Sequence, residues 1–317
     1  MRCDVLFAGL LLAGGCLASA PVAAQPSFEV EQTCWDELQV ETPEAQIAAC
    51  TELLDAAGLP AEDRAALIAM RGWSYHEMGD LDRALAEYSE TIRLEPEAPT
   101  GYGWRGSVYL DKEDYARALD DYSKAIDLAG GDEIDIPVWY QDRATAKRLL
   151  GDHSGAIADY TTALEAGGDN AGAFLLRGYV HFELGDYPLA IDDYTRAINL
   201  APDVASNWND RCWGRAVWGE QLVEARDDCN EAIALDAGDF NAWDSRGLIG
   251  LREQDWHGAL ADYQASLDIE PSASAHFGRG IALKRLGDED QAAEAFAQAA
   301  ALDPAIAETY AGFGIAP

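Results

Sequence analysis

The sequence predicts an all-α fold, a solenoid built from antiparallel helix hairpins. A segment of about 34 residues recurs seven times, and repeats of this length are typical of solenoids. Apolar and small residues recur within each copy at helical spacing, which indicates amphipathic helices, and no alternating strand pattern interrupts them. Each copy contains an Arg followed by a small residue, which is Gly72, Gly106, Ala144, Gly178, Cys212, Gly247 or Gly280.

Each copy contains the signals for two helices joined by a tight turn. Glycine can adopt the left-handed conformation that ends a helix, and a following aspartate can cap the next helix. The small residue after the Arg lets the two helices approach closely, and an aromatic residue such as Tyr88 fills the space beside it. Four copies have the Gly-Asp turn, at Gly79-Asp80, Gly151-Asp152, Gly185-Asp186 and Gly287-Asp288.

Together these features resemble the tetratricopeptide repeat family, in which each unit is a helix–turn–helix. The resemblance covers residues 65–306 and implies a right-handed superhelical solenoid, an α-α superhelix. The third repeat departs from the family pattern at Lys147, where a tyrosine is usual, and the fifth has one extra residue in its turn. The seven repeats span residues 65–98, 99–132, 137–170, 171–204, 205–239, 240–272 and 273–306.

The recurring Arg is predicted to pair with an acid in its own repeat. We number the Arg as repeat position 7, the small residue as position 8 and the aromatic as position 24. In an antiparallel hairpin, positions that sum to about 31 face one another, so position 23 faces the Arg. The predicted pairs are Arg71–Glu87, Arg105–Asp121, Arg143–Asp159, Arg177–Asp193, Arg211–Asp228 and Arg246–Asp262.

In the seventh repeat the acid is replaced. Position 23 is Ala295 there, which leaves Arg279 either free or turned toward Glu294. The alternative to structural pairing is a basic strip that binds phosphate or carboxylate ligands. The acid opposite each of the other six Arg residues favours structural pairing.

The cysteines occupy the same facing positions. Cys212 and Cys229 stand at positions 8 and 24 of the fifth repeat, and the same template laid over residues 27–60 places Cys34 and Cys50 there. We therefore expect a degenerate, disulfide-stapled N-terminal hairpin over residues 27–60 and a second disulfide in the fifth repeat. Each bridge would be worth roughly 3 kcal/mol in the chain-entropy model. Four buried free thiols are the alternative, and the absence of Cys-x-x-Cys argues against redox catalysis.

Residues 1–24 are interpreted as a cleaved signal peptide. A short positive end precedes an apolar stretch too short to span a bilayer comfortably, and small residues lead to a cleavage site before Gln25. An even number of cysteines then remains, as expected in an oxidising compartment. We expect the periplasm, with secretion as one alternative. Lipidation at Cys16, which would make an outer-membrane lipoprotein, is the other.

Several kinds of function are disfavoured. The net charge of −35, from 57 acidic and 22 basic residues, argues against nucleic acid and anionic lipid as partners. The histidines lack zinc spacing, and no phosphate-binding loop, nucleophile elbow or EF-hand loop occurs. The stretch GYGWRG, residues 101–106, has the spacing of a dinucleotide-binding motif, but it lies in a predicted helix with no strand before it. We therefore predict no enzyme, no cofactor and no metal site.

The family resemblance implies a concave groove, lined by first helices, that binds an extended peptide or a partner's helix. Packing of these side chains in the solenoid core is the alternative. A clamp for chaperone C-terminal carboxylates is not expected, because no repeat supplies its lysines and asparagines. The candidate groove residues are Trp73, His76, Gly103, Ser107, Thr145, Tyr179, Phe182, Asn209, Trp213, Asp244, Leu248, Phe277 and Ile281.

Residues 307–317 begin another first helix and then stop. We expect this stub to cover the last hairpin of a monomeric protein, with a C-terminal homodimer as the alternative. The leading hypothesis is an exported, non-enzymatic scaffold that holds a protein or peptide partner in its groove. The alternative is a lipid-anchored or self-associating structural subunit of a cell-envelope complex, acting through its ends.

Overall fold

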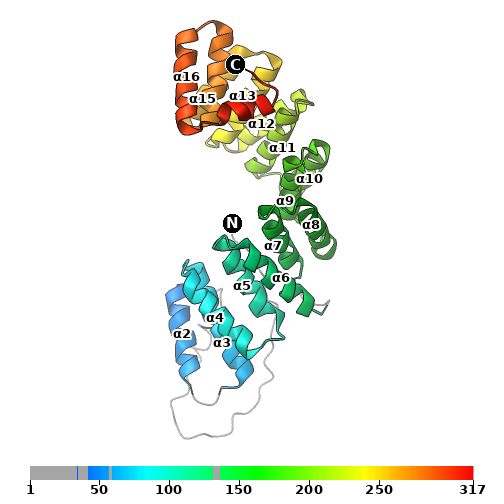
Figure 1. Ribbon diagram of the computed structural model, residues 1–317, viewed down its shortest axis with the longest axis vertical. Helices are drawn as coiled ribbons and strands as arrows, with labels where there is room; N and C mark the ends of the chain where they lie inside the picture. Colours follow the sequence, from blue (N-terminus) through cyan, green and yellow to red (C-terminus); the bar gives the residue numbers. More distant parts are fainter. Residues whose placement is uncertain (1–33, 35–41, 57–58, 131–135, 317) are drawn as a thin grey trace. The chain divides into compact units, whose positions relative to one another are not determined.

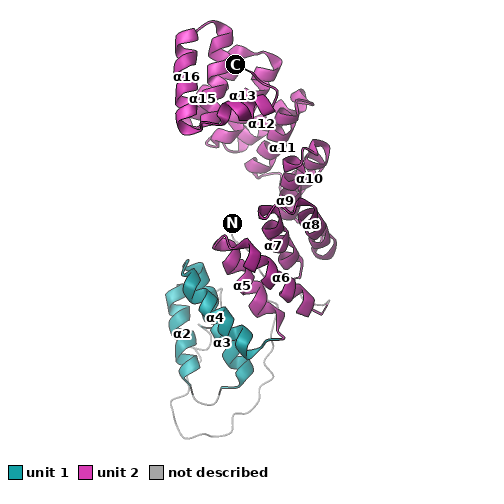
Figure 2. Ribbon diagram, viewed as in Figure 1, with its two compact units in different colours: residues 1–96 teal, residues 97–317 magenta. Residues whose placement is uncertain are grey.

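The computed structural model describes residue 34 and residues 42–56, 59–130 and 136–316. The proposed signal peptide, Cys16 and Gln25 lie outside these described residues. Helices α2 to α17 make up the regular structure of the described ranges, which contain no strand. The all-α prediction is confirmed. The chain divides into two compact units, residues 1–96 and residues 97–317, and each is described by itself (Figure 1, Figure 2).

The described part of the first unit includes the helices α2 (Pro43–Asp55), α3 (Ala61–Glu77) and α4 (Leu81–Leu94). Helix α3 packs against both of the others. Cys34 is bonded to Cys50, and both are buried among apolar side chains of α2 and α3. The buried Gln46 side chain donates to the Cys34 carbonyl at 3.1 Å and accepts from the Ser74 hydroxyl at 2.7 Å. These bonds satisfy polar groups that would be costly to bury alone.

In its described residues the second unit is a series of six hairpins followed by one short helix, α17 (Ile306–Gly312). Each hairpin's second helix packs on the first helix of the next hairpin, which makes the array a solenoid. The hairpins are α5 (Pro99–Asp111) with α6 (Tyr115–Leu128), α7 (Ile136–Leu149) with α8 (His153–Gly167), α9 (Ala171–Glu183) with α10 (Tyr187–Leu200), α11 (Ala205–Trp218) with α12 (Leu222–Leu235), α13 (Phe240–Glu253) with α14 (Trp256–Ile269), and α15 (Ala273–Leu286) with α16 (Glu289–Leu302).

Close approach of the two helices depends on the residues at positions 8 and 24. A Cβ added to Gly178 would lie 2.7 Å from the Tyr194 ring, and one added to Gly280 would lie 2.7 Å from the Phe296 ring. Real Cβ atoms do not approach other atoms so closely. The aromatic ring therefore occupies the space that glycine leaves. In the fifth repeat the Cys212–Cys229 disulfide takes the place of this glycine–aromatic contact.

The turns follow the helix-ending rules expected from the sequence. Gly151 has a φ of +84°, and the Asp152 side chain accepts from the Gly155 backbone N–H at 2.9 Å. The extra residue of the fifth repeat is accommodated by two left-handed residues, Gly219 and Gln221, with φ of +82° and +55°. The hairpin is thereby kept despite the longer turn.

Helix α17 packs back against α15 and α16. Its Tyr310 is buried, and the hydroxyl donates to the Ser274 carbonyl at 3.0 Å and lies 3.3 Å from the Tyr263 hydroxyl. Phe313, just after the helix, meets the Trp213 ring. The C-terminal segment therefore contacts side chains from three hairpins.

Candidate partner-binding surface

The recurring Arg residues of the first six repeats lie against the acids at position 23. In each pair the Nε and Nη2 groups donate to the carboxylate, which is the two-pronged geometry that favours guanidinium for this role. The shortest nitrogen–oxygen distances are between 2.6 and 2.9 Å for Arg71–Glu87, Arg105–Asp121, Arg143–Asp159, Arg177–Asp193, Arg211–Asp228 and Arg246–Asp262.

These Arg residues make two further kinds of contact that the sequence analysis did not predict. The first is a hydrogen bond from Nη1 to a polar side chain at position 25 of the preceding repeat. Examples are Arg177 to Thr161 and Arg211 to Thr195, both at 3.0 Å, and Arg246 to Asn230 at 2.9 Å. The signal was present, because position 25 carries Ser, Thr, Asn or Gln in the first six repeats.

The second contact is with an aromatic ring at position 4. In repeats two to six the guanidinium carbon lies 4.7 to 5.9 Å from the centre of this ring, within the range of a cation–π interaction. Each Arg thus joins its own hairpin, and repeats three to six also join the preceding one. These contacts favour a structural role for the six residues over a basic ligand-binding strip.

The seventh repeat lacks this arrangement. Ala295 at position 23 is buried, and the Arg279 guanidinium forms no ion pair or hydrogen bond with any described residue. Glu294, the alternative acid, instead accepts from Gln298 at 3.4 Å. Arg279 was expected to be either free or turned toward Glu294. Within the described part of the chain its guanidinium is free.

The structure corrects the groove prediction for five candidates, Gly103, Asp244, Leu248, Phe277 and Ile281, which are buried. A Cβ added to Gly103 would overlap the Trp139 indole, and Trp139 is only 3% exposed. The gap at this glycine is therefore filled by a side chain of the next repeat rather than open to a ligand. Leu248, Phe277 and Ile281 belong to the core cluster that includes Tyr310.

The other eight candidates are partly exposed. Trp73 and His76 lie in the first unit, with ring centres 6.4 Å apart. The remaining six lie on α5, α7, α9 and α11 of the second unit, and we call them the first-helix face: Ser107, Thr145, Tyr179, Phe182, Asn209 and Trp213.

The polar members of the first-helix face make bonds within the protein. Ser107 accepts from the Tyr122 hydroxyl at 3.0 Å, Thr145 lies 2.9 Å from the Tyr160 hydroxyl, and Asn209 accepts from Ser245 at 2.8 Å. The aromatic members, Tyr179, Phe182 and Trp213, provide the apolar surface. Aromatic side chains of this kind contribute strongly to protein interfaces.

Three buried or partly buried carboxylates lie on the first helices. Burial raises the pKa of Asp142 and of Asp210 to about 6, and raises the pKa of Asp244 to about 7. Each shift is opposed by a hydrogen bond to the carboxylate. Tyr122 donates to Asp142, Tyr179 to Asp210 and Ser274 to Asp244. The second oxygen of Asp244 is buried without a hydrogen-bond partner among the described residues. Such groups change charge at mildly acidic to neutral pH.

The C-terminal segment of the chain covers one end of the first-helix face. The Phe313 and Trp213 rings meet edge to face with centres 5.5 Å apart, and the Phe313 carbonyl accepts from Arg252 at 2.8 Å. Tyr310 lies over Phe277, with centres 4.8 Å apart. The first helices therefore accept a short aromatic segment here.

The described ranges were also searched for a metal site and for a membrane-spanning helix. They contain no cluster of three or more His, Cys, Asp or Glu side chains arranged to hold a metal ion. The helices described are all too short or too polar to cross a bilayer.

Comparison with known proteins identifies the repeats. Two models described as tetratricopeptide repeat match the chain, one at residues 69–133 and 142–205 and the other at residues 273–306. Together they cover just over half of the sequence.

Curated relatives are matched over short regions. Human serine/threonine-protein phosphatase 5 is 35% identical over 91 residues, which are 29% of this chain and 17% of the phosphatase. Bovine tetratricopeptide repeat protein 36 is 32% identical over 91 residues, 29% of this chain and 48% of that protein. The matches thus span less than half of either relative.

Solved structures share the fold. A tetratricopeptide repeat protein from Parabacteroides merdae has a TM-score of 0.61 and 19% identity, covering 79% of this chain and 99% of that chain. Cut9–Hcn1 of the APC/C has a TM-score of 0.59 and 17% identity, covering 86% and 52%. YrrB, described as having an unusual peptide-binding site, has a TM-score of 0.50 and 20% identity, covering 66% and 96%.

Proposed function

The chain belongs to the tetratricopeptide repeat family, and we propose that it is an exported, non-enzymatic scaffold that binds a protein or peptide partner on the first-helix face. One observation carries this proposal. Tyr310 and Phe313 of the C-terminal segment pack on Phe277 and Trp213, so first helices of this protein already hold a short aromatic segment. A partner would use the neighbouring, uncovered part of the same face.

The uncovered part contains Tyr179 and Phe182 on α9. The Tyr179 hydroxyl donates to Asp210 at 2.6 Å, and the Phe182 ring meets Tyr187 with centres 5.6 Å apart. Both rings are thus held in place while remaining partly exposed. Rigid, partly exposed aromatics lose little conformational entropy on binding, which favours their use at an interface. YrrB gives limited support, since a repeat protein of similar fold is described with a peptide-binding site.

Export is supported by the cysteines. Both pairs that remain after the proposed cleavage at Gln25 are at bonding distance, and disulfides persist mainly in oxidising compartments. A non-enzymatic role is supported by the relatives, because the matches are to repeat proteins and the phosphatase is matched over only 17% of its length. The partner's identity is the object of the experiment.

Site-specific crosslinking in the native envelope tests the proposal. A photoreactive phenylalanine analogue is placed at Phe182, and in a matched control at Leu189, which is 53% exposed on the second helix α10. We expect a defined crosslinked product from position 182 that position 189 does not give. Tyr179→Ala should reduce its yield at least fivefold. Identical products from both positions, or none from position 182, would reject the first-helix face as the binding surface.

A further inference from the structure

We propose that the seventh repeat contains a carboxylate-binding site, centred on Arg279, that takes an acidic side chain from a peptide or protein partner. The site lies between α14, α15 and α16, away from the first-helix face. The proposal is therefore independent of the function assigned to that face.

In six repeats the Arg at position 7 holds a carboxylate with two donors. The seventh repeat keeps the Arg and loses the acid, because position 23 is Ala295. It also loses the contact with the preceding repeat. The residue at position 25 there is Gln264, whose Nε2 donates to Asp268 at 2.7 Å and whose Oε1 accepts no hydrogen bond from Arg279. Arg279 thus retains donors that its counterparts use within the protein.

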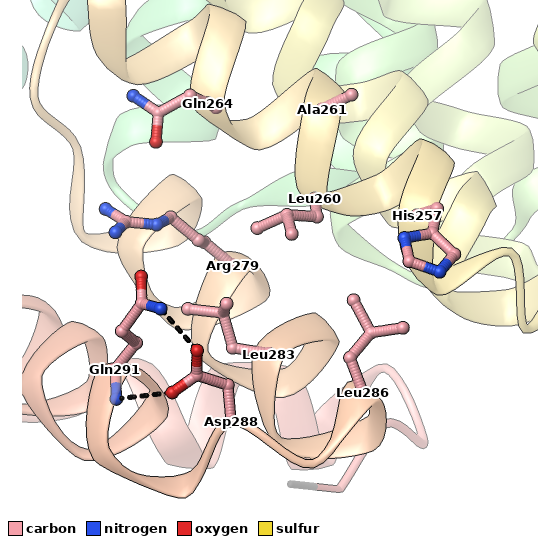
Figure 3. Close-up of a pocket in the computed structure, with 9 residues that line it drawn as sticks. All are labelled: His257, Leu260, Ala261, Gln264, Arg279, Leu283, Leu286, Asp288 and Gln291. Carbon is pink, nitrogen blue, oxygen red and sulfur yellow. Dashed lines mark hydrogen bonds between the residues drawn. The ribbon is translucent and has the colours of Figure 1, made fainter.

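Arg279 lines a pocket of about 610 Å³. Figure 3 shows its side chain extending between the amides of Gln264 and Gln291. Each amide NH₂ group has two donor hydrogens and uses one, Gln264 for Asp268 and Gln291 for Asp288. In Figure 3 the amide oxygens of both residues face the guanidinium and their NH₂ groups point away from it, so the guanidinium of Arg279 is the donor that a carboxylate would meet.

Apolar side chains form the wall beside this polar end. Leu260 comes from α14, and Leu283 and Leu286 come from α15 (Figure 3). A pocket that combines an apolar wall with a guanidinium suits a ligand that is apolar beside its charged group. An acidic residue adjacent to a leucine in a partner chain has this chemistry.

The charge of the site favours a singly charged group. Helix α15 carries three basic residues, Arg279, Lys284 and Arg285, and no acid, in a chain of net charge −35. One acid, Asp288, also lines the pocket, where it caps α16 through the Gln291 backbone N–H at 3.2 Å. One guanidinium beside this carboxylate matches a carboxylate ligand better than a doubly charged phosphate. A second copy of this chain is disfavoured, because it would bring a further net charge of −35 to the site.

The test uses the full mature chain with ¹⁵N-labelled arginine in about 0.15 M salt, where long-range repulsion is screened. The probe is the peptide Ac-Ala-Leu-Glu-Leu-Ala-NH₂, titrated while the Nε–H signal of Arg279 is followed by NMR. Arg279→Gln identifies that signal. The same peptide with glutamine in place of glutamate is the matched ligand control.

Two substitutions on α16 separate the site from a general charge effect. Ala295→Asp restores the acid that the other repeats have, so Arg279 should be occupied from within. Ala297→Asp adds the same charge two residues away at an exposed position. We expect the glutamate peptide to bind at least tenfold more tightly than the glutamine peptide. We also expect Ala295→Asp to weaken binding at least tenfold and Ala297→Asp to change it less than twofold.

Several results would overturn the proposal. Equal titrations by the two peptides would remove the role of the carboxylate. Unchanged binding by Ala295→Asp would remove the role of Arg279. If the buried aspartate prevents folding, unchanged binding by Arg279→Gln, measured by isothermal titration calorimetry, would do the same. Tighter binding of inorganic phosphate than of the peptide would identify a different ligand. A shift of the Arg279 signal with protein concentration alone would identify a second copy.

Discussion

The Trp139 indole occupies the space left by the missing side chain of Gly103. A Cβ built on Gly103 would lie 2.6 Å from Trp139 Cε2. Trp139 lies in the first helix of the third repeat and Gly103 in the first helix of the second, so the contact fixes how two neighbouring repeats pack.

Gly103→Ala should therefore destabilise the protein. Alanine in a helix is ordinarily favoured over glycine by about 1 kcal/mol, but here the added methyl would displace a buried indole at a cost of roughly 1–3 kcal/mol. Chemical denaturation followed by circular dichroism measures the net loss. Gly312→Ala is the control, since a Cβ there meets no atom within 4 Å. A Gly103→Ala protein as stable as the Gly312→Ala protein would contradict the packing described.

The loss of stability on removing the Arg of a buried pair should depend on which other cations contact the acid. Arg177→Ala leaves the buried Asp193 without its guanidinium, which we expect to cost roughly 3 kcal/mol. Arg143→Ala should cost less, because Lys147 also lies 2.7 Å from Asp159. Thermal unfolding of both variants measures the difference.

Double variants supply the control for this comparison. Asp193→Ala in the Arg177→Ala background should add little further loss or recover stability, since the unpaired charge is removed. Additive losses would indicate that the two side chains do not act as a pair.

Stability should fall as pH rises from about 4 to 7. The folded protein holds a proton on Asp244 until a pKa of about 7, whereas the unfolded chain releases it near 3.9. The free energy of unfolding is therefore highest below the unfolded pKa and declines through the folded one. At about 1.4 kcal/mol per pKa unit, the loss attributable to Asp244 is roughly 4 kcal/mol at most.

Asp244→Asn should flatten this dependence. Urea unfolding between pH 4.5 and 8 measures it, and Asp169→Asn, at an exposed position, controls for the loss of one negative charge. Asp142 and Asp210 contribute with the same sign up to their pKa of about 6. If Asp244→Asn and Asp169→Asn give the same pH profile, the buried Asp244 carboxylate does not hold its proton as described.

Loss of the disulfide in the fifth repeat should lower stability by roughly 3 kcal/mol in the chain-entropy model. The double variant Cys212→Ala/Cys229→Ala also leaves the position 8 contact underpacked. Thermal unfolding measures the loss, and non-reducing peptide mapping of the unmodified protein checks the pairing. A cross-link between the two units, for example Cys50 with Cys212, would contradict both bonds.

The sequence predicts a contact correctly where both residues belong to the same repeat. The position of Arg177 opposite Asp193 follows from a single antiparallel hairpin, and so does the approach of Cys212 to Cys229. The hydrogen bond from Arg177 to Thr161 was missed because it crosses to the preceding repeat. Its geometry depends on how hairpins stack, which the spacing within one repeat does not specify.

The groove candidates show the same limit. Gly103 was expected to be open because the pattern within its own repeat has no side chain to cover it, and Trp139 of the next repeat does so. Phe277 and Ile281 were assigned to the groove because their repeat positions face it, although the C-terminal residues were expected to cover the same hairpin. The aromatic contacts of Tyr310 place them in the core instead.

The packing of α17 back onto the preceding hairpins affects how cooperatively those hairpins unfold. The array's stability depends on the coupling between adjacent hairpins, and the Arg at position 7 supplies part of that coupling in earlier repeats. Between the sixth and seventh repeats this contribution is missing, since Arg279 does not reach Gln264. The C-terminal residues instead bridge Trp213 of the fifth repeat, Arg252 of the sixth and Ser274 of the seventh. Because Tyr310 and Phe313 link these three hairpins, we expect the hairpins to unfold together, and to open one at a time once the C-terminal segment is released.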